Sequence, residues 1–151
     1  MTPLVLAAIL RVAMRMSRVP DQDALDAIER EARAQSVPVS LALAVCTVES
    51  GLGTRGRILC GCYVHRRSDD GRPVRDRYGR LAIDTSLDAQ ARCAALSLRH
   101  ARALCGAWAP ALRRYNQGRG CPLADPRGYV SRVVRYQRAA ARLTGERPIT
   151  D

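Results

Sequence analysis

A single carboxylate stands at the end of a long apolar stretch, where it can hold and release a proton. Residues 40 to 53 read SLALAVCTVESGLG, so small and aliphatic side chains lead up to Glu49, and a serine and a glycine follow it. Glu49 is the only acidic residue between Ala32 and Ser68. The apolar stretch predicts a buried helix, and desolvation at its end favours the neutral form of a carboxyl group. A carboxyl group that keeps its proton near neutral pH can serve as a general acid.

The alternative for Glu49 is a solvated surface charge, which is the usual role of a glutamate at a helix end. A negative charge at a helix C-terminus opposes the helix dipole and costs about 0.3 to 1 kcal/mol. The position therefore does not stabilise the helix, which favours a functional role for the carboxylate.

Start and stop residues mark the helices that must position Glu49. Asp21 is predicted to N-cap a helix that continues to about Gln35. Ser36 is predicted to cap the next helix, with Pro38 in its first turn. Apolar side chains cover almost the whole circumference of this second helix, which predicts that it is buried.

Three more helices are predicted in the second half of the chain. Residues 85 to 88, TSLD, have the form of a capping box and open a helix that ends near Gly106. A short helix is predicted from Pro110 to Gly118, and the last helix from Asp125 onward.

The segment between these two groups of helices lacks the helical period. It contains Gly51, Gly53, Gly56 and Gly61, followed by the turn sequence SDDGRP, and it ends near Ile83. Turn residues between short apolar runs predict a small irregular β-hairpin. The order of elements therefore predicts a mostly α (α+β) fold in which the hairpin flanks a cleft.

The length of 151 residues predicts a single domain, here residues 20 to 151, preceded by an amphipathic helix over residues 1 to 19. No basic residue precedes the apolar run of that helix, no clear cleavage site follows it, and Arg11 and Arg15 interrupt it too early for a membrane span. We therefore expect the helix to stay on the protein, where it can dock onto a larger phage or envelope-spanning assembly.

The net charge of +11 comes from arginine alone, because the sequence contains no lysine. Such a charge suits an acidic partner, which can be nucleic acid, an anionic membrane surface or an anionic cell-wall polymer. A coding bias toward arginine explains the excess equally well. Charge alone therefore selects no partner.

Four segments in order resemble the lytic transglycosylase catalytic domains, the lysozyme-like family that cleaves peptidoglycan glycan strands. They are VPVSLALAVCTVESGLG, DAQARCAALSLRHARAL, APALRRYNQGRG and GYVSRVVRYQ, and they cover about residues 21 to 140. The first resembles the family's helix that ends in a Glu-Ser-Gly motif. In the third, residues 114 to 118, RYNQG, stand where the family has Ala-Tyr-Asn-Ala-Gly, and the last resembles its closing Tyr and Val helix.

The resemblance implies cleavage of the β-1,4 bond between N-acetylmuramic acid and N-acetylglucosamine, with a 1,6-anhydro product. Glu49 would act as general acid and then as general base, without a metal or another cofactor. The residues expected to bind substrate are Ser50, Tyr63, Tyr115 and Asn116. Tyr115 would face Glu49 and position it, whereas Ser50 would either contact the sugar or cap its own backbone.

Two stretches depart from the family. Its Gly-Leu-Met-Gln segment is replaced here by CGCYVHRR, in which only Gly61 is recognisable, and the loop from Ser68 to Ile83 aligns with no family segment. The glutamine that the family uses to hold substrate is therefore missing. Tyr129, in the last segment, is expected to be structural.

A hydrolase that works with paired carboxylates remains the main alternative to the transglycosylase. It would need a second acid about 5 to 9.5 Å from the first. Asp69, Asp70, Asp76 and Asp84 lie in or beside the expected hairpin, although the sequence around them is typical of turns.

The six cysteines favour either disulfides or, in a different class of protein, a zinc site. Cys60, Cys62 and His65 are the first candidate ligands, with Cys93, His100 or Cys105 as further ones, and a basic zinc domain would bind nucleic acid. The spacing of Cys-x-Cys is too tight for an ordinary zinc knuckle, so nucleic acid is not favoured. Cys93 and Cys105 lie about 18 Å apart on one predicted helix and cannot bridge each other. If they are oxidised, their partners come from elsewhere in the chain, with Cys60, Cys62 and Cys121 as candidates, and Cys46 is expected to be a small buried hydrophobe.

We therefore expect a peptidoglycan lytic transglycosylase of the periplasm or cell envelope, or of a phage, as a virion component or an endolysin. A non-catalytic protein that binds the cell wall or nucleic acid is the further alternative.

Overall fold

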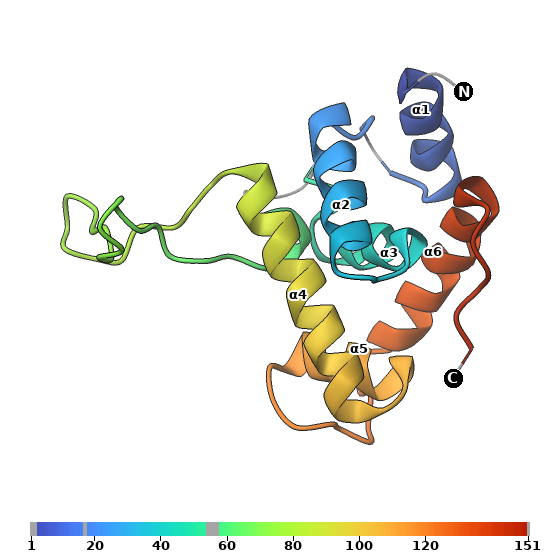
Figure 1. The fold of residues 1–151 in the computed structure, drawn as a ribbon. Helices are drawn as coiled ribbons and strands as arrows, with labels where there is room; N and C mark the ends of the chain where they lie inside the picture. Colours follow the sequence, from blue (N-terminus) through green and yellow to red (C-terminus); the bar gives the residue numbers. More distant parts are fainter. Residues whose placement is uncertain (1–2, 17, 54–57, 151) are drawn as a thin grey trace.

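The computed structural model describes residues 3 to 16, 18 to 53 and 58 to 150, and the side chains from residue 6 onward within these ranges. It is mostly helical, which confirms the expected fold class (Figure 1). The elements are α1 (Pro3–Ala13), α2 (Gln22–Ala34), α3 (Val39–Ser50), the short 3-10 helix η1 (Leu59–Gly61), α4 (Leu87–Cys105), α5 (Trp108–Gln117) and α6 (Tyr129–Thr144).

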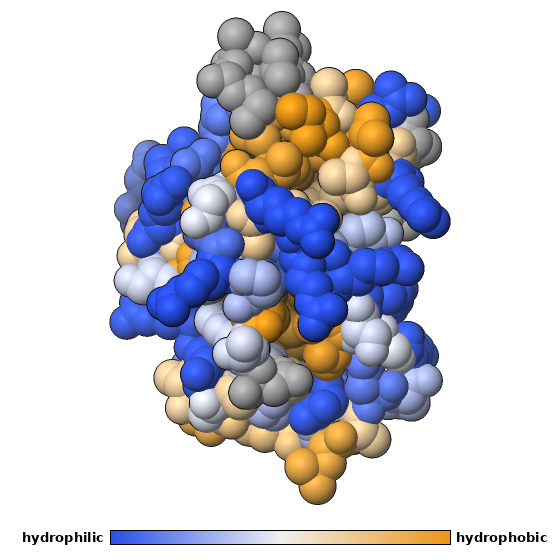
Figure 2. All heavy atoms as spheres, turned by 90° about the vertical axis from the view of Figure 1, so that its right-hand side faces the viewer, coloured by the Kyte–Doolittle hydropathy of each residue, from blue (hydrophilic) through white to orange (hydrophobic). Residues whose placement is uncertain are grey.

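The N-terminal helix α1 packs onto the rest of the domain. Leu10 and Met14 are fully buried in the same core as the other helices, so the segment is not a separate unit in this structure. The helix ends at Ala13, and Val12 on its outer side is 78% exposed. Apolar atoms gather over this helix at the top of Figure 2, above a band of hydrophilic atoms. Within the described residues, no helix has the length and apolar character needed to cross a membrane.

Helix α3 is buried, as its apolar sequence predicts, and it forms the centre of the fold. It packs against α2, α6 and η1, and every side chain from Val39 to Thr47 is buried. The small side chains of this helix, mainly alanine, valine and leucine, allow its neighbours to approach closely on all sides. The interior is therefore built around a helix whose last turn carries Glu49.

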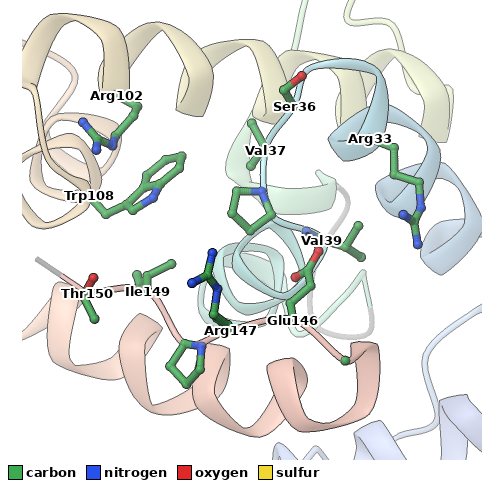
Figure 3. Close-up of a pocket in the computed structure, with 13 residues that line it drawn as sticks. Arg33, Ser36, Val37, Val39, Arg102, Trp108, Glu146, Arg147, Ile149 and Thr150 are labelled. Atoms are coloured by element: carbon green, nitrogen blue, oxygen red, sulfur yellow. Dashed lines mark hydrogen bonds between the residues drawn. The ribbon is translucent and has the colours of Figure 1, made fainter.

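The start of α3 differs from the prediction. Ser36 adopts a left-handed φ of 55° and does not cap the helix, whose N-cap is Pro38. The first N–H groups are satisfied instead by Glu146, which accepts hydrogen bonds from the backbone of Val39 at 2.9 Å and Ser40 at 2.7 Å. Figure 3 shows Glu146 pointing from the segment after α6 toward Val39. A carboxylate at a helix N-terminus also interacts favourably with the helix dipole.

The remaining helix ends agree with the sequence to within a few residues. Asp21 caps α2 as predicted, and Ser86, rather than Thr85, caps α4 by accepting from the N–H of Ala89. Helix α5 begins two residues before Pro110. Helix α6 begins at Tyr129, later than predicted from Asp125, whose carboxylate accepts hydrogen bonds from the N–H groups of residues 129 and 130.

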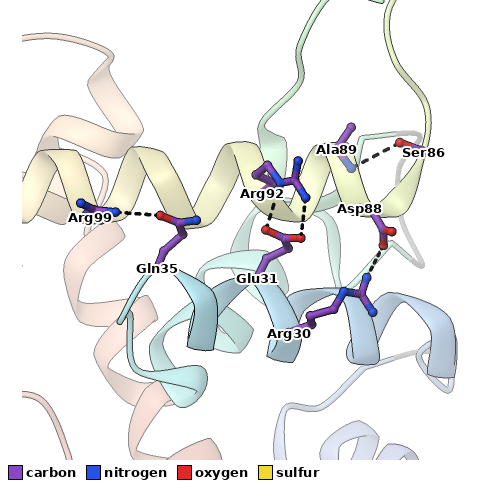
Figure 4. Close-up of polar contacts among 8 residues, drawn as sticks. All are labelled: Arg30, Glu31, Gln35, Ser86, Asp88, Ala89, Arg92 and Arg99. Atoms are coloured by element: carbon purple, nitrogen blue, oxygen red, sulfur yellow. Dashed lines mark hydrogen bonds and ion pairs between the residues drawn. The ribbon is translucent and has the colours of Figure 1, made fainter.

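Polar contacts fix α4 along the length of α2 (Figure 4). The buried Glu31 accepts two hydrogen bonds from Arg92, at 3.2 and 3.3 Å. The flanking contacts are more exposed and therefore contribute less, about 0 to 1 kcal/mol each. They join Arg30 to Asp88 and Arg99 to Gln35. The contacts hold in place the helix that carries one wall of the candidate site.

The predicted β-hairpin is not confirmed. Residues 63 to 85 form an arm that projects away from the helices in Figure 1, and within the described residues it contains isolated antiparallel bridges rather than strands. The bridges pair His65 with Ile83, Arg67 with Pro73 and Arg75 with Leu81. The turn sequences are so close together that each extended piece is too short to form a ladder. Gly56 of the predicted glycine-rich turn and the first two residues of the predicted N-terminal helix lie outside the described residues.

Candidate active site

Glu49 lies in the last turn of α3, and its side chain is exposed. The prediction that this carboxylate is buried is therefore wrong. The helix is enclosed up to Thr47, but its final turn reaches the surface, and Glu49 is on the open side of that turn while Ser50 faces inward. An exposed carboxylate at the end of a rigid, buried helix has a fixed backbone position and remains accessible to a substrate.

Gly61 lies directly against the Glu49 side chain. A Cβ atom at position 61 would be 2.7 Å from Oε2 of Glu49 and 3.1 Å from its Cδ. Gly61 also has a φ of +65°, which side chains rarely adopt. Only glycine therefore lets the backbone approach the carboxylate this closely, and the chain segment around Gly61 forms one side of the Glu49 site.

Two disulfides hold this segment in place. Cys46, one turn before Glu49 on α3, is bonded to Cys60, and Cys62 is bonded to Cys93 on α4. The two bridges flank Gly61 in the sequence. They fix the chain on both sides of the residue that contacts the carboxylate.

Hydrogen bonds from three helices hold the same segment. The hydroxyl of Ser50 accepts from the backbone N–H of Cys60 at 3.2 Å, and the side chain of Gln90 accepts from the N–H of Leu59. Tyr115 of α5 donates its hydroxyl proton to the carbonyl of Cys60 at 2.7 Å. The buried backbone groups of the segment thus have partners on α3, α4 and α5, which restrains it more firmly than an ordinary surface loop.

Two tyrosines lie near the Glu49 carboxylate. Desolvation, and then the negative charge of Glu49, raise the pKa of Tyr115 above its usual value. Desolvation and the charge of Glu49 raise the pKa of Tyr129 as well. Both phenols therefore keep their protons at physiological pH and act as hydrogen-bond donors or neutral dipoles.

Tyr129 has a hydroxyl group that can still donate a hydrogen bond. Its side chain is 2% exposed, and among the described residues its buried hydroxyl has no hydrogen-bond partner of ordinary geometry. The Glu49 carboxylate is close enough to raise the pKa of Tyr129, but the two groups do not form a hydrogen bond of ordinary geometry. The sequence predicts a structural role for Tyr129. Its nearness to Glu49 is a contact across 80 residues, which no local sequence pattern reveals. Tyr115, in contrast, uses its proton on the carbonyl of Cys60.

The other expected substrate-binding residues occupy different environments. Ser50 is buried and takes part in three hydrogen bonds with backbone groups, which corresponds to the backbone-capping alternative rather than to sugar contact. Asn116 is exposed near the end of α5. Tyr63 is 47% exposed at the base of the arm, where its ring meets the ring of His65 edge to face at 5.9 Å.

A cavity of about 230 Å³ adjoins this site between α4, α5 and the segment after η1. Two of its lining residues also belong to the Glu49 site. Gly61 contacts the Glu49 carboxylate, and Tyr115 donates a hydrogen bond to the carbonyl of Cys60. Its lining consists of Gly61, Cys62, Ser97, His100, Ala101, Arg114, Tyr115 and Gly118.

The aspartates considered as a second acid are in the arm. Asp70, Asp76 and Asp84 accept hydrogen bonds from backbone N–H groups of the arm's own turns and of the approach to α4. Hydrogen bonds from neighbouring serines are the main cause that lowers the pKa of Asp70 and of Asp84. Asp69 is exposed in the same turn as Asp70. These carboxylates serve the turns, as their sequence context predicts.

All six cysteines are paired, and the third bridge joins Cys105 to Cys121. The partners of Cys93 and Cys105 thus belong to the predicted set. Cys46 is buried but bonded to Cys60, so its expected role as an unpaired hydrophobe is wrong. The alternative zinc site loses its thiolate ligands, and within the described part of the chain no three His, Cys, Asp or Glu side chains are grouped to hold a metal ion.

A larger open cavity of about 970 Å³ lies at the opposite end of α3, about 15 Å from Glu49 along the helix. Figure 3 shows Trp108 beside Arg102 on one side of it and Arg147 on the segment after α6. Arg102 stacks over the Trp108 ring at 5.6 Å. This cavity is separate from the Glu49 site.

Comparison with protein-family models, with curated proteins and with solved structures finds no match for this chain.

Proposed function

We propose that this protein is a peptidoglycan lytic transglycosylase, with Glu49 as both general acid and general base. The observation that carries the proposal is the contact between Gly61 and the carboxylate of Glu49, at the end of the buried helix α3. This contact joins residues 40 to 53, which resemble the family's helix ending in Glu-Ser-Gly, to Gly61, the one recognisable residue of the segment that departs from the family. The matching order of the later segments and the neighbouring tyrosines support the same function.

The proposed reaction needs one carboxyl group and no water. Glu49 gives its proton to the glycosidic oxygen as the bond to C1 of the muramic acid breaks. The 6-hydroxyl of the same sugar then attacks C1, and the Glu49 carboxylate takes the proton from that hydroxyl, which closes the 1,6-anhydro ring and regenerates the protonated acid.

Tyr129 fits this cycle as a positioning residue. A buried hydroxyl without a hydrogen bond of ordinary geometry costs stability, about 1 to 3 kcal/mol, and a functional role can account for its retention. When substrate orders Glu49, a hydrogen bond from Tyr129 would fix the rotamer of the carboxyl group and stabilise its ionised form. The Gly61 backbone also restricts the positions open to the carboxylate.

The hydrolase is the second candidate, since it would use the same glutamate. Three of the arm aspartates that the sequence suggested as its second carboxylate accept hydrogen bonds from turn N–H groups, which favours a structural role for them. We place the protein in the periplasm or cell envelope or in a phage particle, where peptidoglycan is within reach.

The test is mass spectrometry of purified peptidoglycan after incubation with wild type, Glu49→Gln and Tyr129→Phe. We expect anhydromuropeptides from the wild type, none from Glu49→Gln, and about tenfold fewer from Tyr129→Phe, whose unfolding temperature stays equal or rises. Reducing-end products would support the hydrolase. No cleavage by folded wild type would reject both enzymes in favour of a binding protein.

A further inference from the structure

We propose that the cavity beside Gly61 binds a carboxylate of the peptide attached to the muramic acid whose glycosidic bond is cleaved. This inference rests on the proposed function, and it names the part of the substrate that the enzyme selects. The ligand chemistry is that of a short acidic peptide rather than of a further sugar.

The position of the cavity connects it to the reacting sugar. Gly61 lines the cavity and also contacts Glu49, so this one residue connects the cavity to the carboxylate. The peptide of peptidoglycan is attached through the lactyl group of muramic acid, which is the ring whose C1 reacts at Glu49. The peptide on that ring must therefore begin close to Glu49.

The cavity carries cationic and hydrogen-bonding groups without an acidic one. Arg114 of α5 supplies the positive charge, His100 of α4 supplies a ring that can form hydrogen bonds, and none of the lining residues is acidic. Arg114 is partly buried and donates one N–H to the carbonyl of Gly120 at 2.9 Å, which holds the guanidinium while other donors remain for a ligand. The guanidinium fork matches the geometry of a carboxylate, and the hydroxyl of Ser97 adds a further donor.

The size of the cavity also suits part of a peptide. Pockets that enclose drug-sized ligands have volumes of about 300 to 1,000 Å³. A volume of about 230 Å³ is below that range, so the cavity accommodates one carboxylate-bearing residue rather than another disaccharide. Arg114 also stands where the family resemblance places an alanine, so this cation is a feature of this chain.

The experiment compares three forms of one substrate with the full chain. The first is glycan strands with their peptides, the second the same strands after an amidase has removed the peptides, and the third strands whose peptide carboxylates have been converted chemically to amides. The initial rate of anhydro-product formation is measured below saturation for each. We expect the wild type to cleave the first form about tenfold faster than the other two, which corresponds to about 1.4 kcal/mol.

Variants assign the preference to the cavity. Arg114→Ala should reduce the rate ratio of the first to the third form to nearly one. Ser97→Asp, which puts a negative charge in the cavity, should reduce it as well. Arg119→Ala is the matched control, because it removes one exposed arginine near the same loop that does not line the cavity, and it should keep the wild-type ratio.

Equal cleavage of charged and amidated strands by the wild type would overturn the inference while leaving the proposed reaction intact. The same ratio in Arg114→Ala and Arg119→Ala would also overturn it, because the preference would then come from overall charge. Cleavage of none of the three forms by folded wild type would reject the proposed function, and this inference with it.

Discussion

Replacement of Gly61 by alanine tests how the backbone positions Glu49. The new Cβ would stand 2.7 Å from Oε2 of Glu49, closer than atoms can remain, so one of the two must move. The contact is with the far end of a flexible side chain, and we expect the Glu49 carboxylate to swing away while the backbone stays in place. The substitution therefore changes the position of the proposed catalytic group.

The effect on stability can be separated from the effect on activity. A left-handed φ costs a residue other than glycine about 1 to 2 kcal/mol. For a protein of this size each kcal/mol lowers the unfolding temperature by about 2 to 4 °C, which gives a decrease of about 2 to 8 °C. A displacement of the reacting group by about 1 Å can cost a hundredfold in rate, so we expect a loss of peptidoglycan cleavage of about that size.

Gly106→Ala is the matched control for this experiment. Gly106 has a φ of +76° at the end of α4, and an added Cβ would meet nothing within 4 Å. Calorimetry should show a similar decrease in unfolding temperature for both variants, whereas the cleavage assay should show a large loss for Gly61→Ala alone. Full activity of Gly61→Ala, or equal losses of activity in the two variants, would refute the role assigned to the contact.

Two further predictions concern stability and the disulfides. Desolvation raises the pKa of Glu146, but hydrogen bonds from the start of α3 outweigh it, and the pKa lies below its usual value. The carboxylate therefore stabilises the fold above the ordinary glutamate pKa of about 4.3, and this contribution is lost as the pH falls below that value. Urea unfolding at several pH values from 7 to 3 measures this contribution. At neutral pH the free energy of unfolding of Glu146→Gln should be about 1 kcal/mol below that of wild type, and the difference should disappear at low pH. A difference that does not change with pH would contradict this. Removal of the Cys46–Cys60 bridge or the Cys105–Cys121 bridge, by alanine at both positions, should cost about 3 kcal/mol each, because they close loops of similar length. Cleavage at a temperature where both variants are folded should fall only without Cys46–Cys60, and an equal fall in both would show that this bridge has no special role at Glu49.

The sequence alone determined the features that depend on near neighbours. The helical period and the turn and cap residues predicted the order of the helices, and the run of small apolar side chains predicted that α3 is buried. The cap at Asp21 and the turns around Asp70 follow from hydrogen bonds between residues two or three apart. The choice of Glu49 as the candidate acid came from its place at the end of that helix.

Only the tertiary structure decided which groups surround Glu49. The exposure of its side chain, the approach of Gly61, and the unpartnered hydroxyl of Tyr129 depend on packing between segments 12 to 80 residues apart. The cysteine pairs and the cap of α3 by Glu146, across 107 residues, also depend on contacts between segments that are distant in the sequence. Local sequence patterns fix only the conformation of a short segment and the side of it that is apolar, whereas these contacts arise from the way the apolar sides pack together.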